Sequence, residues 1–393
     1  MTRSVGSVVY QFKVNGQPVY DFPLDVELHQ AWGKHEVMFV RVVATKNRAY
    51  MRYLTTWPND AAVEVLWGRA PDNLNTFYGY VNHHEVKTDD DEGFGSIQVT
   101  YTLTGTAKPM NTDQQREWWS VTPQQIAIQI AKEYKLRSVV TQITNWTLDY
   151  EVQAGESDFK FLNRIAEKVG FRFWVSGGTL YFIDPNVVLS DLTQFYVPHY
   201  TIDHAPGTQD TARDFQRLQG DNLPGGVVAQ RSISGIDYST GLPFNVIADG
   251  TAGLAINSVN SEWHVDNYDL ARKLINASQS LNQFWIGGYV EVFGFTPIYP
   301  GKAIHLSGYA MPDESAGYWI VAACQHVLKA HASTDTTLDR YVTRCQIIKN
   351  TRNVIPDIKG VQKIRPEIIS CHLVNKKWQA DQFGTVTEGI VKV

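Results

Sequence analysis

Two short stretches of the chain hold side chains that could perform chemistry. In the first, His83, His84 and Glu85 stand together, and four acidic residues follow within ten positions. Imidazole and carboxylate groups can hold a divalent cation between them. Neighbouring side chains on a strand point to opposite faces, however, so His83 and His84 would not converge on one ion. We therefore favour an exposed hairpin tip with solvated acids over a metal site, and no metal is predicted.

The second stretch places Glu117 beside Trp118 and Trp119. A glycosidase cleaves a sugar chain with a pair of carboxylates, and aromatic rings can stack on the sugar. The sequence does not reveal the partner acid of Glu117, and a buried tryptophan pair that anchors its domain is the favoured interpretation. The patterns HExxH, GxSxG, GxxxxGK[ST] and GxGxxG are missing from the sequence. We predict no catalytic residues, no cofactor and no enzyme activity.

Composition narrows the class of protein further. The 393 residues are enough for two to four domains of ordinary size. Charged residues make only 19% and aromatic residues 12%, which is typical of a β-rich protein with large interfaces. A net charge of -5 gives no basic field for nucleic acid, and three cysteines without a CxxC pair argue against a disulfide scaffold. Neither a signal peptide nor a run of about 18 apolar residues is seen, so no membrane anchoring is expected.

The hydrophobic pattern divides the chain into four parts. Residues 1–107 alternate with period two between turn residues, which predicts a first antiparallel β-barrel domain. Residues 108–190 hold two capped helical patterns and a hairpin, so we expect an inserted α+β domain. Residues 191–350 return to strands around one further helical pattern, which predicts a second β-barrel domain. Residues 351–393 are locally basic and read as a C-terminal docking extension.

The two helical patterns of the insert have clear boundaries. Thr122 precedes Pro123, and Gln125 stands where a capping box needs Glu or Gln. The second pattern begins after Ser157 and stops at Gly170. Both patterns repeat apolar residues with helical spacing, so each helix is expected to bury one face.

The first and last β regions share a plan. Three segments of the first region resemble three of the last: 39–43 and 289–293, 66–68 and 306–308, and 77–81 and 318–322. His83 and His326 follow the third pair, and a strand at 97–103 or 341–347 closes each set. Identity is low, so chance similarity between two meanders is the alternative. If the duplication is real, the chain holds two related barrels.

At this point the residues resemble a known family. Val152–Phe159, Phe161–Gly170 and Gly178–Phe182 are similar to the stretch QxxESDxxFLxRLAEExG…GxLxF of phage tail hub proteins. That group comprises the late control protein D family, the hubs of contractile-tail baseplates and the heads of type VI secretion spikes. Residues 122–136 and Thr76–Val81 are similar to its preceding helix and to its TFxGYV strand. No long repetitive spike follows, which favours a tail whose spike is a separate chain.

The resemblance implies a fold and a role. The expected fold is mainly β, with two related, tail-tube-like barrels and a helix-containing insert. The expected role is a homotrimeric hub of a phage tail tip or baseplate, whose six barrels form a pseudo-sixfold ring around the DNA exit channel. Implied partners are the tail tube or distal tail ring, a separate spike or tip protein and the tape measure protein, while DNA passes without specific binding. The implied location is the virion, after assembly in the host cytoplasm.

Two candidate surfaces and two alternative functions complete the expectation. The acidic loop Asp89, Asp90, Asp91 and Glu92 could face the channel and repel the DNA backbone. A basic cluster could dock an acidic partner, or could simply be a solvated face; it comprises Lys359, Lys363, Arg365, Lys376 and Lys377. The alternatives are the hub of a tail-derived injection device, such as a type VI or extracellular contractile system, and a tail-associated enzyme that degrades cell walls.

Overall fold

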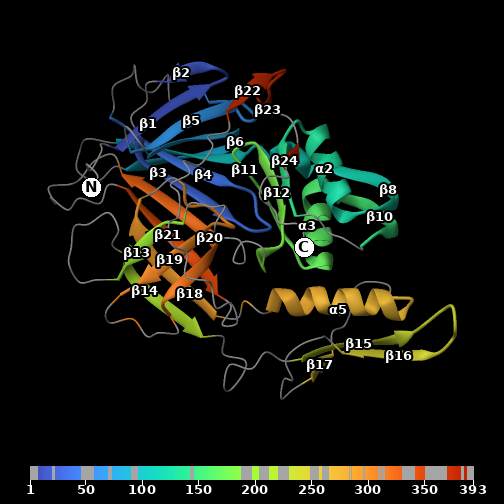
Figure 1. Cartoon of the computed structure of the whole chain (residues 1–393). Helices are drawn as coiled ribbons and strands as arrows, with labels where there is room; N and C mark the ends of the chain where they lie inside the picture. Colours follow the sequence, from blue (N-terminus) through green and yellow to red (C-terminus); the bar gives the residue numbers. More distant parts are fainter. Residues whose placement is uncertain are drawn as a thin grey trace.

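A computed structural model of the 393-residue chain gives the fold (Figure 1). The structure describes residues 8–19, 23–45, 57–69, 73–89, 96–141, 146–186, 197–202, 212–219, 230–247, 256–258, 265–282, 284, 286–294, 297–308, 311, 315–329, 341–349, 370–381 and 385–386.

A first sheet module occupies the N-terminal part of the chain. Its strands are β1 (Val8–Val14), β2 (Gln17–Val19), β3 (Pro23–Ala31), β4 (Val37–Thr45), β5 (Ala62–Arg69), β6 (Asn73–Asp89) and β7 (Ser96–Gly105). They are hydrogen-bonded in the order β3-β4-β7-β6-β5-β1-β2. The period-two alternation turns one face of each strand inward. That face packs around Trp57, Trp67, Phe77 and Tyr101, all at most 1% exposed.

A second sheet module follows later in the chain. Its strands are β13 (His199–Thr201), β14 (Ala212–Gln219), β18 (Ile286–Phe293), β19 (Ala303–Ser307), β20 (Gly317–Lys329) and β21 (Tyr341–Lys349). The order is β14-β18-β21-β20-β19-β13, and neighbours are antiparallel except for β13 and β19. Trp319, Ile304 and Ile347 lie in its core and are fully buried.

The two modules share one strand order. In the first module β3-β4-β7-β6-β5 are neighbours, and β14-β18-β21-β20-β19 follow the same order in the second. A β-bulge interrupts β6 after Val81 and β20 after Val321. Aligning these bulges makes Val65 equivalent to Leu306, because each pairs with the residue four positions before its bulge.

This register corrects part of the sequence alignment. The pairing confirms the matches of 39–43 with 289–293 and of 97–103 with 341–347. The other two matches were wrong by one residue, because identical Leu and Gly letters were aligned instead of the strand faces. His83 is consequently not the equivalent of His326.

The modules join edge to edge into one 13-stranded sheet. Strand β20 of the second module pairs antiparallel with β3 of the first, from Ala323 opposite Ala31 to Lys329 opposite Asp25. We call this pairing the internal seam. The prediction of a mainly β fold with a helix-containing insert is confirmed (Figure 1). The division into two separate β-barrel domains stays a prediction.

The insert lies between the modules in sequence. Its elements are η1 (Lys108–Asn111), β8 (Asp113–Val121), α2 (Pro123–Glu133), β9 (Arg137–Val140), β10 (Leu148–Ser157), α3 (Asp158–Val169), β11 (Arg172–Ser176) and β12 (Thr179–Ile183). The helix boundaries agree with the predicted caps. Thr122 and Gln125 form the capping box, Ser157 accepts a hydrogen bond from the Lys160 amide, and Gly170 ends α3 at φ 80°.

Helix α5 (Tyr268–Asn282) packs on the insert although it comes later in the chain. Its buried Ala271, Leu274 and Ile275 join the insert's core, as do Ile233 and Val246 of the small sheet beside it. That sheet comprises β15 (Gln230–Ile236), β16 (Pro243–Ile247) and β17 (Ile256–Ser258). Figure 1 shows α5 lying between this sheet and α3. The domain division at residue 191 stays a prediction, and this packing crosses it.

The C-terminal strands fold back onto the rest of the chain. They are β22 (Cys371–Val374), β23 (Lys377–Ala380) and β24 (Thr385–Val386), the last of which pairs with β9. Trp378 is 6% exposed and packs on Tyr78 and Tyr80 of β6. Its indole Nε1 donates to the Gly79 carbonyl oxygen at 2.8 Å. None of the helices within the described ranges is long and apolar enough to cross a membrane.

Candidate functional site

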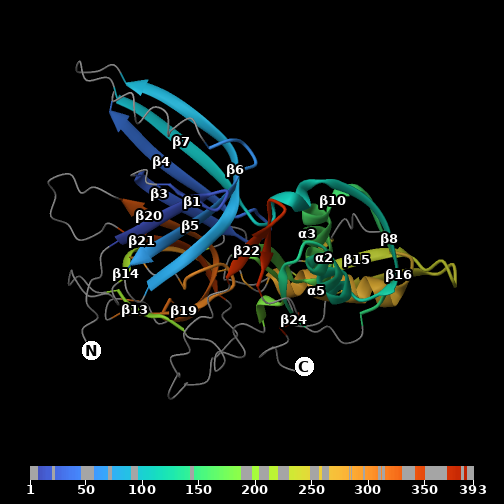
Figure 2. The same cartoon turned by 90° about the horizontal axis from the view of Figure 1, so that it is seen from above.

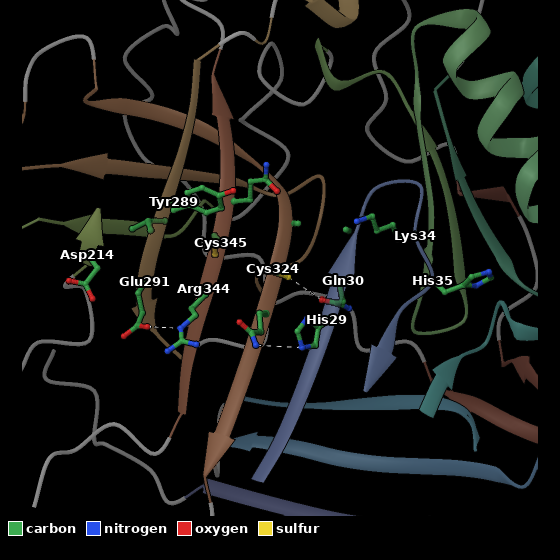
Figure 3. Close-up of a pocket in the computed structure, with 15 residues that line it drawn as sticks. His29, Gln30, Lys34, His35, Asp214, Tyr289, Glu291, Cys324, Arg344 and Cys345 are labelled. Carbon is green, nitrogen blue, oxygen red and sulfur yellow. Dashed lines mark hydrogen bonds and ion pairs between the residues drawn. The ribbon is translucent and has the colours of Figure 1, made fainter. Parts of the chain in front are cut away.

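The internal seam opens on one side into a cavity of about 620 Å³. Strands β3, β14, β18, β20 and β21 all contribute to its walls (Figure 3). The pleat of the sheet puts every second side chain of these strands on the cavity side. That side is polar, and we call it the seam face; it carries Glu27, His29, Tyr289, Glu291, Gln325, Arg344 and Gln346.

Strand register lines up the charges of the seam face across four strands. Arg344 lies opposite Glu291 on one side and Gln325 on the other. Its Nε donates to Glu291 Oε2 at 2.8 Å (Figure 3). Gln325 Nε2 donates to Glu27 Oε2 at 3.2 Å. Arg344 is 56% exposed, so this ion pair adds at most about 1 kcal/mol to stability.

The opposite side of the seam is buried and neutral. His326 is fully buried; its Nε2 lies 2.9 Å from the Ile298 carbonyl oxygen, and its Nδ1 lies 2.9 Å from the Tyr341 hydroxyl. Burial lowers the pKa of His326 to about 3, so the ring donates through Nε2 and accepts through Nδ1. Burial also raises the pKa of the Cys324 thiol, which leaves it a poor nucleophile.

Glu36 joins both modules to the insert at one buried point. Gln30 Nε2 of β3 donates to Glu36 Oε1 at 2.6 Å, and Ser176 Oγ of β11 donates to the same oxygen at 3.0 Å. Gln30 also accepts from Cys324 Sγ of β20 at 3.3 Å. Burial raises the pKa of Glu36 to about 7, although its hydrogen bonds oppose the shift. We call this cluster the three-way junction.

The residues shared with the hub motif build the insert. Asp158 is fully buried and accepts from Gln153 Nε2 at 2.8 Å, Tyr134 Oη at 2.6 Å and Arg116 Nη2 at 3.1 Å. Arg164 pairs with Glu156 at 2.6 Å. These contacts tie α3 to β10, β8 and the C-terminal end of α2, so the motif holds the elements of the insert together.

Residues 59–235 match the phage tail baseplate hub family. This range includes β5–β8, the motif network on α3 and the first strands after the insert. The resemblance predicted from the sequence is thereby confirmed, and no curated protein matches the chain.

Solved structures share the fold over most of the chain. A tail protein from Neisseria meningitidis is 12% identical, with a TM-score of 0.60 over 87% of this chain and 97% of that one. The 43 kDa tail protein of a Shewanella oneidensis prophage is also 12% identical, with a TM-score of 0.60 over 88% and 99%. An Escherichia coli type VI secretion component is 10% identical, with a TM-score of 0.54 over 92% and 82%. At these identities the likeness establishes a shared fold and no more.

The two candidate surfaces predicted from the sequence lie only partly within the described residues. Asp89 ends β6, while Asp90, Asp91 and Glu92 lie outside the described residues. The candidate docking residues Lys359, Lys363 and Arg365 also lie outside them. Lys376 and Lys377 are exposed in and after the β22–β23 turn. The roles of both surfaces stay predictions.

The two chemistry-bearing stretches take different places. His83 and His84 are exposed on β6, and His83 Nε2 lies 3.4 Å from Thr102 Oγ1. Within the described ranges, no three His, Cys, Asp or Glu residues gather to hold a metal. Trp118 is 6% exposed and stacks on Phe161, whereas Trp119 is 62% exposed. The interpretation of a buried tryptophan pair was therefore right for Trp118 and wrong for Trp119.

Sequence reasoning missed the three-way junction and the seam face. Gln30, Glu36 and Ser176 are far apart in the sequence, and no local pattern marks them as partners. Alternation along a strand indicates which face is buried, but it cannot show that β3 and β20 pair.

Proposed function

We propose that this chain is the structural hub of a phage tail tip or baseplate. Three copies form a ring that adapts the tail tube to a separate spike or tip protein and encloses the DNA exit channel. The observation that carries the proposal is the presence of two modules with one strand order in a chain whose central part matches the hub family. A trimer then presents six related modules, which lets a threefold part mate with a sixfold tube.

The seam face is the proposed wall of the channel. Its charges alternate in sign from Glu291 to Arg344, so it offers DNA no continuous positive surface. The acidic loop at Asp89–Glu92 adds negative charge that repels phosphate, so DNA slides through without specific binding. Replacing the four acids by Asn or Gln should slow DNA ejection, and an unchanged ejection rate would count against this role.

The basic cluster is the proposed docking site for an acidic partner. Lys376 and Lys377 sit on the β22–β23 hairpin, which Trp378 anchors to the first module. Docking there would position the partner against a rigid part of the hub. Charge reversal of Lys376 and Lys377 should weaken incorporation of the chain into tails in a salt-dependent way. Charge-preserving exchange to Arg is the matched control.

The proposed role needs no catalysis. Exposed Trp119 lies tilted against Tyr150 with ring centroids 4.2 Å apart, and its Nε1 donates to Glu117 Oε2. An exposed aromatic pair beside a carboxylate is the feature that a cell-wall-degrading enzyme would need. Purified full-length protein should leave peptidoglycan intact in a zymogram. Clearing that is lost on Glu117→Gln would overturn the structural assignment.

An injection device derived from a phage tail is the second candidate. It is favoured by the likeness to the Escherichia coli type VI secretion component over 92% of this chain. Neighbouring genes separate the two candidates, because capsid and terminase genes accompany a phage tail and not an injection device.

The trimer is tested by the mass of the purified full-length protein in solution. We expect a species of three chains, and electron micrographs down its axis should show a ring with six lobes. A stable dimer or a ring with another number of lobes would contradict the proposal.

A further inference from the structure

Strand β6 extends well beyond its partner β5. The pairing with β5 stops at Tyr80, whereas β6 continues to Asp89. Of the strands that the structure describes, only β7 pairs with the outer half of β6. Figure 2 shows β6 and β7 projecting past β5. The outer half of β6 therefore presents backbone donors and acceptors along one side, as an edge strand does.

The equivalent edge in the second module is filled. Strand β20 also extends past its partner β19, and its outer half pairs with β21 on one side. On its other side lies β3, paired over seven residues from Ala323 to Lys329. The internal seam thus shows what a partner strand looks like at this position of the repeat.

Exposure records the difference between the two edges. Aligned on the bulges, His84 and Val86 of β6 correspond to Cys324 and His326 of β20. Cys324 and His326 are 4% and 0% exposed, while Val86 is 55% exposed and His84 is exposed as well. The positions on β20, which has β3 beside it, are thus buried, whereas the equivalent positions on β6 are exposed.

The strand that would fill the open edge is also identified by the repeat. Strand β14 is equivalent to β3, since it pairs with β18 as β3 pairs with β4. β14 ends the strand order of the sheet, and among the described strands it pairs with β18 alone. Its outer edge corresponds to the edge of β3 that makes the internal seam.

The two pairings fix the register. The alignment of the bulges makes Gly287 of β18 equivalent to Val37 of β4. Leu218 pairs with Gly287, and His29 pairs with Val37. Leu218 therefore occupies the position of His29. Glu85 occupies the position of Gln325. Gln325 lies directly opposite His29 in the internal seam, so Glu85 should lie opposite Leu218, and Lys87 opposite Gln216.

We propose that β14 of one copy pairs antiparallel with residues 83–87 of β6 in the next copy, in the register that places Glu85 opposite Leu218. This inference rests on the proposed trimer and names the contact that closes it. Each copy offers one open β6 edge and one open β14 edge, so the contact is head-to-tail and repeats around a ring. The ring then alternates internal seams with seams between copies.

Disulfide trapping tests the register on the full-length protein. The variant Glu85→Cys/Leu218→Cys places two thiols on exposed positions about 4.5–5.5 Å apart between Cα atoms if the register is right. Mild oxidation should give bands of two and three chains on a non-reducing gel. Gln325→Cys/His29→Cys is the matched control at the internal seam, and it should form a bond within one chain.

Two further variants define the specificity of the result. Glu85→Cys/Gln216→Cys moves one thiol to the diagonal position, about 7–8 Å away between Cα atoms, and should give much less product. The single variants show the background from the three native cysteines. Equal product from the diagonal pair, or no product above the single variants, would overturn the proposed seam. A three-chain mass without the Glu85–Leu218 bond would overturn the seam alone and leave the hub standing.

Discussion

Glu36 makes the fold of this protein depend on pH in a way that can be calculated. Its pKa rises from 4.5 to about 7 because the carboxyl group is buried at the three-way junction. Between these values the folded chain keeps a proton that the unfolded chain has lost. The contribution of protonated Glu36 to the free energy of unfolding is therefore fully present below pH 4.5, and it is lost as the pH rises towards 7. A shift of about 2.5 pKa units at 1.36 kcal/mol each gives a loss of about 3 kcal/mol.

The variant Glu36→Gln replaces the titratable carboxyl group by a neutral amide, so it should remove this pH dependence. Urea unfolding followed by tryptophan fluorescence, from pH 4.5 to pH 8, should show the variant gaining about 3 kcal/mol relative to the natural protein as the pH rises. Any constant cost of fitting the amide cancels in this comparison. Glu85→Gln, on the exposed half of β6, controls for the loss of one charge. Parallel pH profiles for Glu36→Gln and the natural protein would refute the reasoning.

Three further perturbations follow from the contacts. Asp158→Ala removes a fully buried acceptor that Gln153, Tyr134 and Arg116 share, and it should cost about 3–5 kcal/mol in urea unfolding. Exposed Asp149→Ala should change the free energy of unfolding by at most about 0.5 kcal/mol. Trp378→Ala should release the β22–β23 hairpin, seen as faster amide hydrogen exchange there with unchanged exchange in α3. Gly301→Ala forces a Cβ to within 2.5 Å of the Trp174 ring at φ +83°, so the melting temperature should fall; an unchanged value would show that the ring can move.

Local signals predicted the elements that local chemistry determines. The capping box at Thr122, the cap at Ser157 and the left-handed Gly170 were all readable, because each involves residues within a few positions of one another. The motif around Asp158 gave the family, although only the structure shows that its residues hold α3 against β8 and β10.

Long-range pairing could not be predicted in the same way. Periodicity shows which face of β20 is buried, but β3 lies almost three hundred positions away and carries no mark of being its partner. The repeat was recognised, yet letter identity misplaced two of its four segments by one residue, because low identity leaves the register to the β-bulges. The burial of Trp119 was overestimated because a two-stranded sheet leaves one face in solvent.

The central claim is that two related modules per chain let three copies imitate a sixfold ring. A cryo-electron microscopy reconstruction of the assembled tail, without imposed symmetry, tests it most directly. We predict three copies of this chain on the tail axis, with alternating β3–β20 and β14–β6 seams around the channel. Absence of the chain from the axis, or a copy number other than three, would contradict the account.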